Sequence, residues 1–488
     1  MSQRTAIFSK LVKDGPVEPP LTVTPGSCLK AVVEAMRAQK AACVIVVNAR
    51  GGAEGIITEQ DITRRVIFRM DETSPVTEVM SSPVISLQES EYLYYAIARM
   101  RRHGFRHMPV VNAAGKVTGT LSLANTIAAA SAQVMNEIDL LTREDTIQGQ
   151  AEIKQAQVSL AAQMMSENIP ATDIMGLITR INNDIYRRIV NLNLTAMVTE
   201  GFGPPPVGFS VIVMGSGGRS ENYLYPDQDN GFILDDYPDA RHQEIDPWFI
   251  ELAERMTRDL DAVGLPLCKG FVMANNPLWR KSLSQWKHQL EIWNQRPNTT
   301  RLRLCDIFFD FRTVWGSEQG ADELRRHVTR IAGNNPAFLR AMYEDDQDHG
   351  TALGWFGRFI TVKKADEPAY EGYLNLKHSG SLPLVEAMRL LALREGITKI
   401  STLDRMAALH ESGGLSADEY DYLSAAFRHI AHLLLRQQLT DFKQQKRVGY
   451  FIHPDHLSAR EKDMLVSSLQ AIDQLRKRIR SEFTGDIF

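Results

Sequence analysis

Two aspartates that follow a glycine–serine pair are the residues of this chain best suited to metal and phosphate chemistry. An apolar run over residues 211–214 ends at Gly215-Ser216, and Asp227 and Asp229 follow eleven and thirteen residues after the serine. Side chains at positions i and i+2 of an extended segment point the same way, so both carboxylates are expected to face one point. Two hard oxygen ligands at one point suit Mg²⁺, or Mn²⁺, bound to substrate phosphates.

The glycine–serine turn supplies a second device for binding phosphate. Such a turn leaves backbone N–H groups free at the start of a helix, which we expect over residues 219–224. Arg219 is expected to support a phosphate, because a guanidinium matches phosphate geometry, and Glu221 to fix Arg219 or cap the helix. Gly215, Ser216 and Arg219 are therefore the predicted nucleotide-binding residues, and the whole stretch predicts nucleotidyl transfer. The alternative is that both motifs are ordinary turns.

The motif over residues 215–230 resembles a known family. Its pattern, Gly-Ser-x-Gly-Arg-x-Glu followed by Asp-x-Asp, is similar to the nucleotidyltransferase branch that contains the protein uridylyltransferases and adenylyltransferases of nitrogen regulation. The Asp-Gln-Asp-Asn version resembles the nucleotidyltransferases linked to CBS (cystathionine β-synthase) domains. The resemblance implies Mg²⁺-dependent transfer of AMP or UMP from ATP or another NTP to a hydroxyl acceptor.

Catalysis in that superfamily needs a third carboxylate on a later strand, and residues 302–315 are predicted to form it. Asp306 and Asp310 are four residues apart, so an unbroken strand places both on one face. The resemblance favours Asp310, which lies in a Phe-Phe-Asp-x-Arg run, and leaves Asp306 in reserve. The alternative for Asp310 is an internal salt bridge with Arg312.

Asp227, Asp229 and Asp310 are therefore the predicted catalytic residues and metal ligands. The third carboxylate is the natural group to take the proton of the attacking hydroxyl. Lys377 and Arg389, further along the chain, are candidates to lie near the nucleotide, although exposed helix cations are the default interpretation.

An internal repeat with an offset of 64 residues occupies residues 20–130. Residues 46–48 (Val-Val-Asn) fall on residues 110–112 (also Val-Val-Asn), and Gly55 falls on Gly119. Each copy has the pattern of a helix, a strand, a glycine turn, a second strand and a second helix, which indicates a duplicated supersecondary unit. The segment over residues 55–61 resembles the CBS-domain signature.

A CBS pair implies a regulatory cleft for an adenine nucleotide. Thr58 is expected to hydrogen-bond a phosphate and Asp61 to accept from ribose hydroxyls. In the second copy Ser122 keeps the hydroxyl, whereas Asn125 replaces the aspartate and lacks its charge-assisted strength. The alternative for Thr58 and Asp61 is a simple cap of the following helix.

Composition places the chain among ordinary globular proteins. It has 488 residues, of which 44% are hydrophobic and 23% charged, and a net charge of −4, so no basic field invites nucleic acid. Four scattered cysteines suggest buried thiols in a reducing compartment. The first residues lack the apolar run of a signal peptide, and no stretch is apolar enough to span a membrane. We therefore expect a cytoplasmic protein.

The fold class expected is multidomain α/β and α. The predicted domains are an N-terminal tail (1–19), a tandem CBS pair (20–130), a helical linker (131–200), a catalytic α/β core with a mixed sheet (201–318) and a C-terminal helical domain (319–488) that resembles the helical module of the same family. CBS pairs commonly associate, so a homodimer through that pair is expected.

Three functions fit these residues. The preferred one is a nucleotide-regulated nucleotidyltransferase that modifies a hydroxyl of a protein in signal transduction. The second is a nucleotidyltransferase that modifies small molecules. The third is a sensor or scaffold that has lost its chemistry, against which the retained Asp227 and Asp229 argue.

Overall fold

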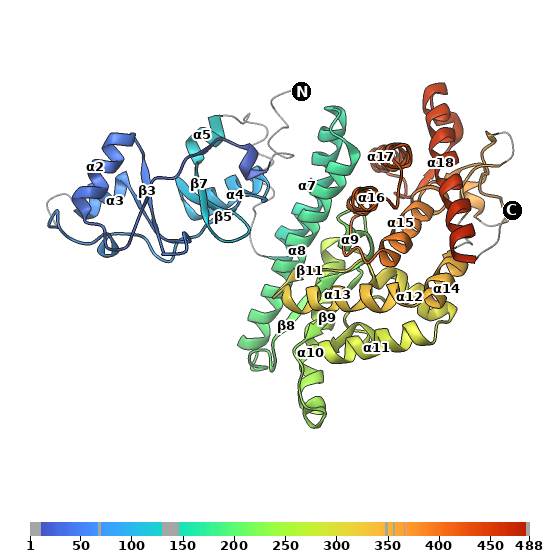
Figure 1. The fold of residues 1–488 in the computed structure, drawn as a ribbon, viewed down its shortest axis with the longest axis horizontal. Helices are drawn as coiled ribbons and strands as arrows, with labels where there is room; N and C mark the ends of the chain where they lie inside the picture. Colours follow the sequence, from blue (N-terminus) through green and yellow to red (C-terminus); the bar gives the residue numbers. More distant parts are fainter. Residues whose placement is uncertain are drawn as a thin grey trace. The chain divides into compact units, whose positions relative to one another are not determined.

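The computed structural model describes residues 11–66, 70–128, 146–346, 350–354, 357–365 and 367–484 of the chain. It divides into two compact units, Met1–Arg143 and Glu144–Phe488, each of which is drawn in Figure 1. The first ten residues of the predicted tail and residues 131–145 of the predicted linker lie outside the described residues.

The first unit contains the predicted repeat, with matching elements in each copy. The first copy consists of β2 (Thr22–Val23), α2 (Leu29–Gln39), β3 (Cys43–Val47) and β4 (Ala53–Thr58), and the second of β5 (Leu87–Gln88), α4 (Leu93–His103), β6 (His107–Val111), β7 (Val117–Ser122) and α5 (Leu123–Ala128). Val46 pairs with Gly55 in one hairpin and Val110 with Gly119 in the other, and each register shifts directly after that pair. The offset of 64 therefore holds at the level of single hydrogen-bonded pairs.

Strand β1 (Val17–Glu18) pairs antiparallel with β7, so the four-stranded sheet of the second copy has the order β1-β7-β6-β5. The first copy forms a three-stranded sheet, β2-β3-β4. Its core is aliphatic and comes from one face of α2 and the inward residues of β3 and β4, including Leu29, Val32, Val44 and Ile57. Val44 and Val46 of β3 face this core, whereas Ile45 packs in a separate cluster with Val111 and Val117. A slip of one residue would turn the core residues to the other face, so this packing fixes the register of the hairpin.

The second unit is built around a four-stranded mixed sheet with the order β10-β9-β8-β11. Its strands are β8 (Phe209–Val213), β9 (Asn230–Leu234), β10 (Arg280–Ser282) and β11 (Arg312–Trp315). Strands β8 and β11 are both antiparallel to their neighbours, whereas β9 and β10 run parallel. Every residue of β8 and β9 is buried, which indicates that both faces of the sheet are covered.

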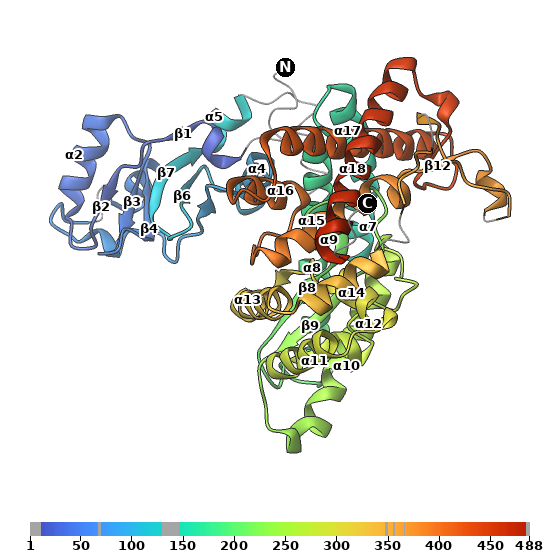
Figure 2. The ribbon, with the colours of Figure 1, turned by 45° about the vertical axis from the view of Figure 1, so that its right-hand side comes forward.

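Two long helices precede this sheet and belong to the same unit. Helix α7 (Ile147–Ser166) packs against α8 (Ala171–Thr199), and both contact α10 (His242–Val263) and α17 (Ala417–Lys443). Figure 2 shows these helices together with the elements of the sheet. The part of the predicted linker that the structure describes is thus packed into the second unit.

The chain after the sheet is mainly helical. The helices are α13 (Gln319–Gly333), α14 (Pro336–Asp346), α15 (Leu382–Arg394), α16 (Thr402–Glu411), α17 and α18 (Ala459–Thr484), with a small antiparallel pair of strands, β12 (Leu374–Asn375) and β13 (Phe451–Ile452). Helix α15 is buried along nearly its whole length. Among the described residues, no helix combines the length and apolar character needed to cross a membrane.

The segment predicted as one strand over residues 302–315 is helical over its first half, and only its last four residues form a strand, so that prediction is wrong. Helix α12 covers Thr299–Phe308, after α11 (Leu283–Gln295), and only β11 is extended. Asn298 caps α12 by accepting a hydrogen bond from the N–H of Arg301. Leu302, Cys305 and Phe308 recur every three residues on its buried side, which is a helical period.

Candidate active site

The predicted glycine–serine turn lies directly after β8. Met214 is extended, and the short helix α9 covers Gly215–Arg219. Gly215 has a φ of +56°, and a Cβ at this position would lie 3.1 Å from Oδ2 of Asp229. Because a side chain here would be strained and would crowd that carboxylate, glycine allows Asp229 to approach the backbone of the turn.

Helix α9 ends at Arg219, so the helix predicted over residues 219–224 is wrong. Ser220 adopts the left-handed conformation with a φ of +64°, and this ends the helix. The Ser216 hydroxyl donates to Oδ1 of Asn222 at 2.9 Å, which ties the turn to the loop that leads to the aspartates.

Three helices hold that loop through its backbone. The N–H of Asn222 donates to Thr179 of α8 at 2.9 Å. Leu224 donates its N–H to Gln438 of α17 at 3.1 Å, and its carbonyl accepts from the buried Lys154 of α7 at 2.8 Å. The path of the chain towards Asp227 is therefore set by side chains that lie far away in the sequence.

The two aspartates alternate with buried amides. Asp227 is exposed and Asp229 half-buried, whereas Gln228 and Asn230 are fully buried. Gln228 donates through Nε2 to the carbonyls of Thr257 and Leu265, at 3.0 and 2.8 Å. Since these buried amides point into the protein, the carboxylates of Asp227 and Asp229 are directed to the opposite side, as the i, i+2 spacing predicts.

Electrostatic contacts show that the two carboxylates are neighbours. The pKa of Asp229 is raised to about 6, chiefly by burial and also by the charge of Asp227, although a hydrogen bond from the Cys268 thiol acts in the opposite direction. Burial also raises the pKa of Asp227. Two carboxylates that repel each other beside a backbone turn fit a divalent cation, because its charge would offset the repulsion and oxygen is the ligand that Mg²⁺ prefers.

A lysine from the C-terminal helical region joins this pair. Lys377, at the start of the π-helical turn η8 (Lys377–Ser381), lowers the pKa of both Asp227 and Asp229 through its charge. Its ammonium lies 4.1 Å from the ring centroid of Tyr450. The default interpretation of Lys377 as an exposed helix cation is thus wrong, and the site receives positive charge from a segment about 150 residues away.

Asp310, the predicted third carboxylate, has a different environment. It has no exposed surface, and it pairs with Arg219 at 2.7 Å, Arg389 at 2.8 Å and Arg405 at 2.6 Å. Although burial alone would raise its pKa, these three guanidinium groups hold that pKa far below the usual range. A carboxylate enclosed by arginines has little capacity to bind a cation or accept a proton, so the structure does not support Asp310 as metal ligand and base.

The alternative partner expected for Asp310, Arg312, is also incorrect. Arg312 donates instead to the carbonyl of Gly218, at 3.1 Å. A Cβ at Gly218 would lie 1.6 Å from the carbonyl oxygen of Asp310, so only glycine lets these two segments touch. Gly218 of the motif therefore permits the contact between α9 and the chain before β11.

Arg219, predicted to support a phosphate, is part of the same arginine cluster. Its Nε donates to Glu221 at 2.7 Å and its Nη1 to Asp310 at 2.7 Å. The other oxygen of Glu221 accepts from the N–H of Thr402, the first residue of α16, at 2.7 Å. The prediction that Glu221 fixes Arg219 is confirmed, and the arrangement gives Arg219 a structural role in place of a phosphate contact.

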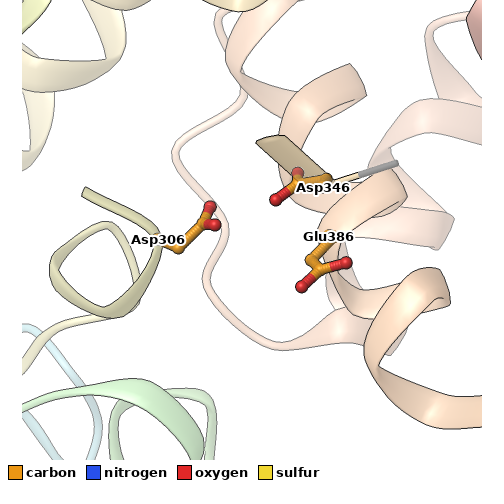
Figure 3. A group of neighbouring side chains, drawn as sticks. All are labelled: Asp306, Asp346 and Glu386. Atoms are coloured by element: carbon orange, nitrogen blue, oxygen red, sulfur yellow. The ribbon is translucent and has the colours of Figure 1, made fainter. Parts of the chain in front are cut away.

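The reserve candidate Asp306 lies on α12 in a separate acidic cluster, shown in Figure 3. Carboxylate oxygens of Asp306, Asp346 and Glu386 lie within 4.8 Å of one another. Arg389 pairs with Asp306 at 2.7 Å. Burial, the charges of the two neighbouring acids and a hydrogen bond with Asp306 raise the pKa of Asp346 well above its usual value. Asp306 is therefore also absent from the pair formed by Asp227 and Asp229.

Comparison with protein families agrees with this geometry. Residues 155–300 match the model described as "Putative nucleotidyltransferase DUF294", and residues 336–483 match its companion, described as "Putative nucleotidyltransferase substrate binding domain". Residues 12–67 and 76–131 match the CBS domain. The chain belongs to this CBS-linked nucleotidyltransferase family.

Individual relatives of this family member cover only part of its length. An uncharacterized 17.7 kDa protein of Acidianus ambivalens is 30% identical over 101 residues, which are 21% of this chain and 61% of that protein. The inosine-5'-monophosphate dehydrogenase of Mycobacterium tuberculosis is 33% identical over 111 residues, 22% of this chain and 20% of the enzyme. The chain spans 61% and 54% of the first two curated relatives.

Solved structures give a similarly partial match. The CBS domain protein PAE2072 from Pyrobaculum aerophilum, complexed with AMP, is 21% identical, covers 27% of this chain and 98% of its own, and has a TM-score of 0.24. A conserved protein from Pyrococcus horikoshii is 24% identical, covers 25% of this chain and 92% of its own, and also has a TM-score of 0.24.

The CBS pair contains a cavity of about 280 Å³ between its two copies. Thr58, Asp61 and Arg65 line it from the first copy, and residues 104–107 line it from the second. Thr58 and Asp61 also form a capping box, in which the N–H of Thr58 donates to Asp61 at 2.9 Å and the N–H of Asp61 donates to the Thr58 hydroxyl at 3.3 Å. The capping interpretation is thus confirmed, and the same two residues face a cavity.

The two regulatory residues predicted in the second copy, Ser122 and Asn125, do not line that cavity. Ser122 is buried at the end of β7 and accepts a hydrogen bond at its carbonyl from Thr126. Asn125 donates to Glu18 of β1 at 2.7 Å. Of the two predicted regulatory pairs, Thr58 and Asp61 are therefore the one that lines this cavity.

Proposed function

We propose that the second unit is a Mg²⁺-dependent nucleotidyltransferase that moves AMP or UMP from an NTP to a hydroxyl of a signalling protein. One observation carries this proposal: the Asp229 carboxylate lies against the backbone of the Gly215 turn, next to Asp227. Metal ligands and a phosphate-binding turn are thereby neighbours, as phosphoryl chemistry requires.

In this mechanism Asp227 and Asp229 would hold Mg²⁺, which neutralises charge on the triphosphate. Gly215 and Ser216 position phosphate oxygens against their backbone N–H groups. Lys377 provides positive charge near both aspartates, where an ammonium suits a phosphate. The buried Gln228 keeps both carboxylates directed towards the substrate through its two carbonyl contacts.

The test is incubation of the protein with each α-labelled NTP and Mg²⁺ in a cell lysate. We expect label on a protein band, with AMP or UMP as the group transferred, and none with Asp227→Asn. Label found only on small molecules would replace the protein acceptor with a small one. Transfer by Asp227→Asn at the rate of the unaltered protein would overturn the proposal.

A second function, nucleotide sensing without turnover, is favoured by one observation. The residue expected to act as base, Asp310, is enclosed by Arg219, Arg389 and Arg405. In that case NTP and Mg²⁺ would bind the second unit, and Asp227→Asn would lower that affinity, yet no pyrophosphate would be released under any condition. Release of pyrophosphate from NTP in the presence of lysate would exclude this alternative.

We also propose that the cavity beside Thr58 and Asp61 binds an adenine nucleotide that regulates the second unit. Arg65, which lines the cavity, would meet its phosphates. An adenine nucleotide that binds one conformation of the protein more tightly than another shifts the equilibrium between the two conformations. If AMP, ADP and ATP left the initial transferase rate of the unaltered protein unchanged, regulation by this cavity would be excluded. It would also be excluded if these nucleotides changed the rate of Asp61→Ala by the same factor as that of the unaltered protein.

Cellular location and assembly follow as two smaller proposals. We place the protein in the cytoplasm and expect a homodimer through the CBS pair. Cell fractionation tests the location. Light scattering of the full chain tests the dimer, which would be rejected by a mass close to the 54.9 kDa of one chain at all concentrations.

A further inference from the structure

A cavity in the second unit lies beside β10, which is an edge strand of the sheet. Its volume is about 490 Å³, within the range of small-molecule sites. Its walls come from β10 and the two helices that follow it, α11 and α12, together with the start of α10. Neither the family matches nor the motifs of the sequence assign a ligand to it.

The cavity has a surplus of positive charge. Arg280, Lys281 and Arg301 line it, and Asp246 is the one carboxylate among its lining residues. Asp246 is already occupied by Arg280, which meets it through Nε at 2.9 Å and Nη2 at 3.3 Å. Arg280 also donates to the carbonyl of Ala274 at 2.7 Å, so it is fully engaged. Lys281 and Arg301 therefore contribute charge that Asp246 does not neutralise.

Lys281 shows the effect of this surplus. Its side chain is half-buried. Burial and the adjacent Arg280 lower its pKa, and only the charge of Asp246 acts in the other direction. A half-buried ammonium without a carboxylate of its own is costly unless an anion joins it. The partly desolvated positive charge in the cavity wall is therefore unfavourable in the empty cavity, and a bound anion would offset it.

The remaining wall residues indicate what kind of anion fits. His288 and Gln285, from α11, are polar groups able to donate hydrogen bonds. Pro277 and the partly exposed Ile292 supply apolar surface on the same wall. A cationic end with an apolar wall suits a molecule that carries a phosphate on a carbon skeleton.

We propose that this cavity binds a phosphate-bearing small molecule, with Lys281 and Arg301 as the groups that hold its phosphate. Ammonium and guanidinium are complementary in this task, because one acts as a point charge and the other donates in a fixed planar geometry. The site is separate from the pair formed by Asp227 and Asp229 and does not depend on the function proposed for them.

Pyridoxal 5'-phosphate tests the proposal directly on the full chain. Arg301 would hold its phosphate while its aldehyde condenses with the neutral amine of the neighbouring Lys281, releasing water, and borohydride then reduces the imine to a stable amine that mass spectrometry locates. Lys287, six residues later and paired with Glu323 outside the cavity, is the internal control. We expect label at Lys281 to exceed label at Lys287 several-fold.

Protection experiments distinguish the source of the phosphate. Inorganic phosphate, glycerol phosphate and AMP are each added before the reagent at equal ionic strength, with chloride as reference. Protection by all three identifies the phosphate group itself, whereas protection by the organic phosphates alone identifies a contribution from the carbon skeleton. Both results support the proposal. Equal label at Lys281 and Lys287, or label at Lys281 that none of these reduces, would overturn it.

Matched variants remove the remaining ambiguity. Arg301→Gln should abolish the preference for Lys281, and Arg301→Lys should restore part of it. Arg303→Gln is the control, because Arg303 lies on the same helix and pairs with Asp345 at 3.7 Å outside the cavity. Thermal unfolding of each variant confirms folding. If folded Arg301→Gln still carried more label at Lys281 than at Lys287, the role of Arg301 would be contradicted. Asp227→Asn should carry the same ratio of label at the two lysines as the unaltered protein.

Discussion

Replacing Asp310 with asparagine separates a structural role from a catalytic one. The substitution keeps the shape of the side chain and removes its charge from the centre of three arginines at 2.6–2.8 Å. Asp310 has no exposed surface, and the side chains of Arg389 and Arg405 are each only 3% exposed, so solvent offers little screening. Removing one partner of such a buried group costs about 3–5 kcal/mol, because the charges left behind are uncompensated.

The assay is denaturant unfolding of the full chain at pH 7, followed by a signal from the second unit. We expect Asp310→Asn to lower the free energy of unfolding by about 3–5 kcal/mol. Asp239→Asn, on an exposed 3-10 turn, is the control and should stay within about 0.5 kcal/mol. Arg389→Met removes one of three guanidinium groups and also frees Asp306, so it should destabilise as well.

The pH dependence of this ion-pair cluster has a definite sign. The pKa of Asp310 is lower in the folded protein than in the unfolded chain. Its contribution to stability is therefore complete above the unfolded pKa, about 4, and is lost only as the pH falls towards the folded value. If Asp310→Asn unfolded at the same denaturant concentration as the unaltered protein while losing all transferase activity, Asp310 would be a catalytic ligand and our assignment would be refuted.

Three further outcomes follow from the same contacts. Asp229→Asn should lower activity at least about 100-fold, a loss typical of misplaced reacting groups. It should also raise the free energy of unfolding above pH 6, because a carboxylate whose pKa is raised on folding destabilises the folded state once it ionises. Activity assays and denaturant unfolding at pH 5 and pH 8 check both effects, and equal stability of the variant and the unaltered protein at pH 8 would contradict the burial of this charge. Gly218→Ala should lower the free energy of unfolding by about 3 kcal/mol or more, because the added Cβ would lie 1.6 Å from the carbonyl oxygen of Asp310. Gly217→Ala is the control in the same unfolding assay, because no atom would lie closer than 3.6 Å to its Cβ. Lys377→Met should raise KM for the NTP about tenfold, a loss of about 1.4 kcal/mol of phosphate binding, with Lys377→Arg retaining part of the affinity; an unchanged KM would exclude a contact with the triphosphate.

The sequence was sufficient for features that depend on local spacing. The 64-residue repeat aligned Val46 with Val110 and Gly55 with Gly119, and the structure gives each copy the equivalent hairpin pair, Val46 with Gly55 and Val110 with Gly119. The i, i+2 spacing of Asp227 and Asp229 predicted that they act as a pair, because alternation in an extended segment requires no knowledge of the rest of the fold. Glycine at 215 likewise fits its positive φ.

Features that depend on distant contacts were missed. Asp310 was interpreted as a ligand because its arginine partners lie 79 to 95 residues away, and nothing in the local run indicates them. The helix α12 was mistaken for a strand, although Leu302, Cys305 and Phe308 have helical spacing and Asn298 is a recognisable cap. Tertiary packing brings Lys377 close to Asp227 and Asp229, and the local sequence around Lys377 does not indicate this.

Divalent cation binding by Asp227 and Asp229 tests the central claim most directly. Titration of Mn²⁺ into the full chain with a non-hydrolysable NTP, followed by electron paramagnetic resonance, counts bound ions. Asp346→Asn tests whether the acidic cluster of Figure 3 contributes to the bound Mn²⁺. We predict that Asp227→Asn and Asp229→Asn each lose the tightest Mn²⁺ site and that Asp346→Asn keeps it. Retention of that site in both active-site variants would contradict the account.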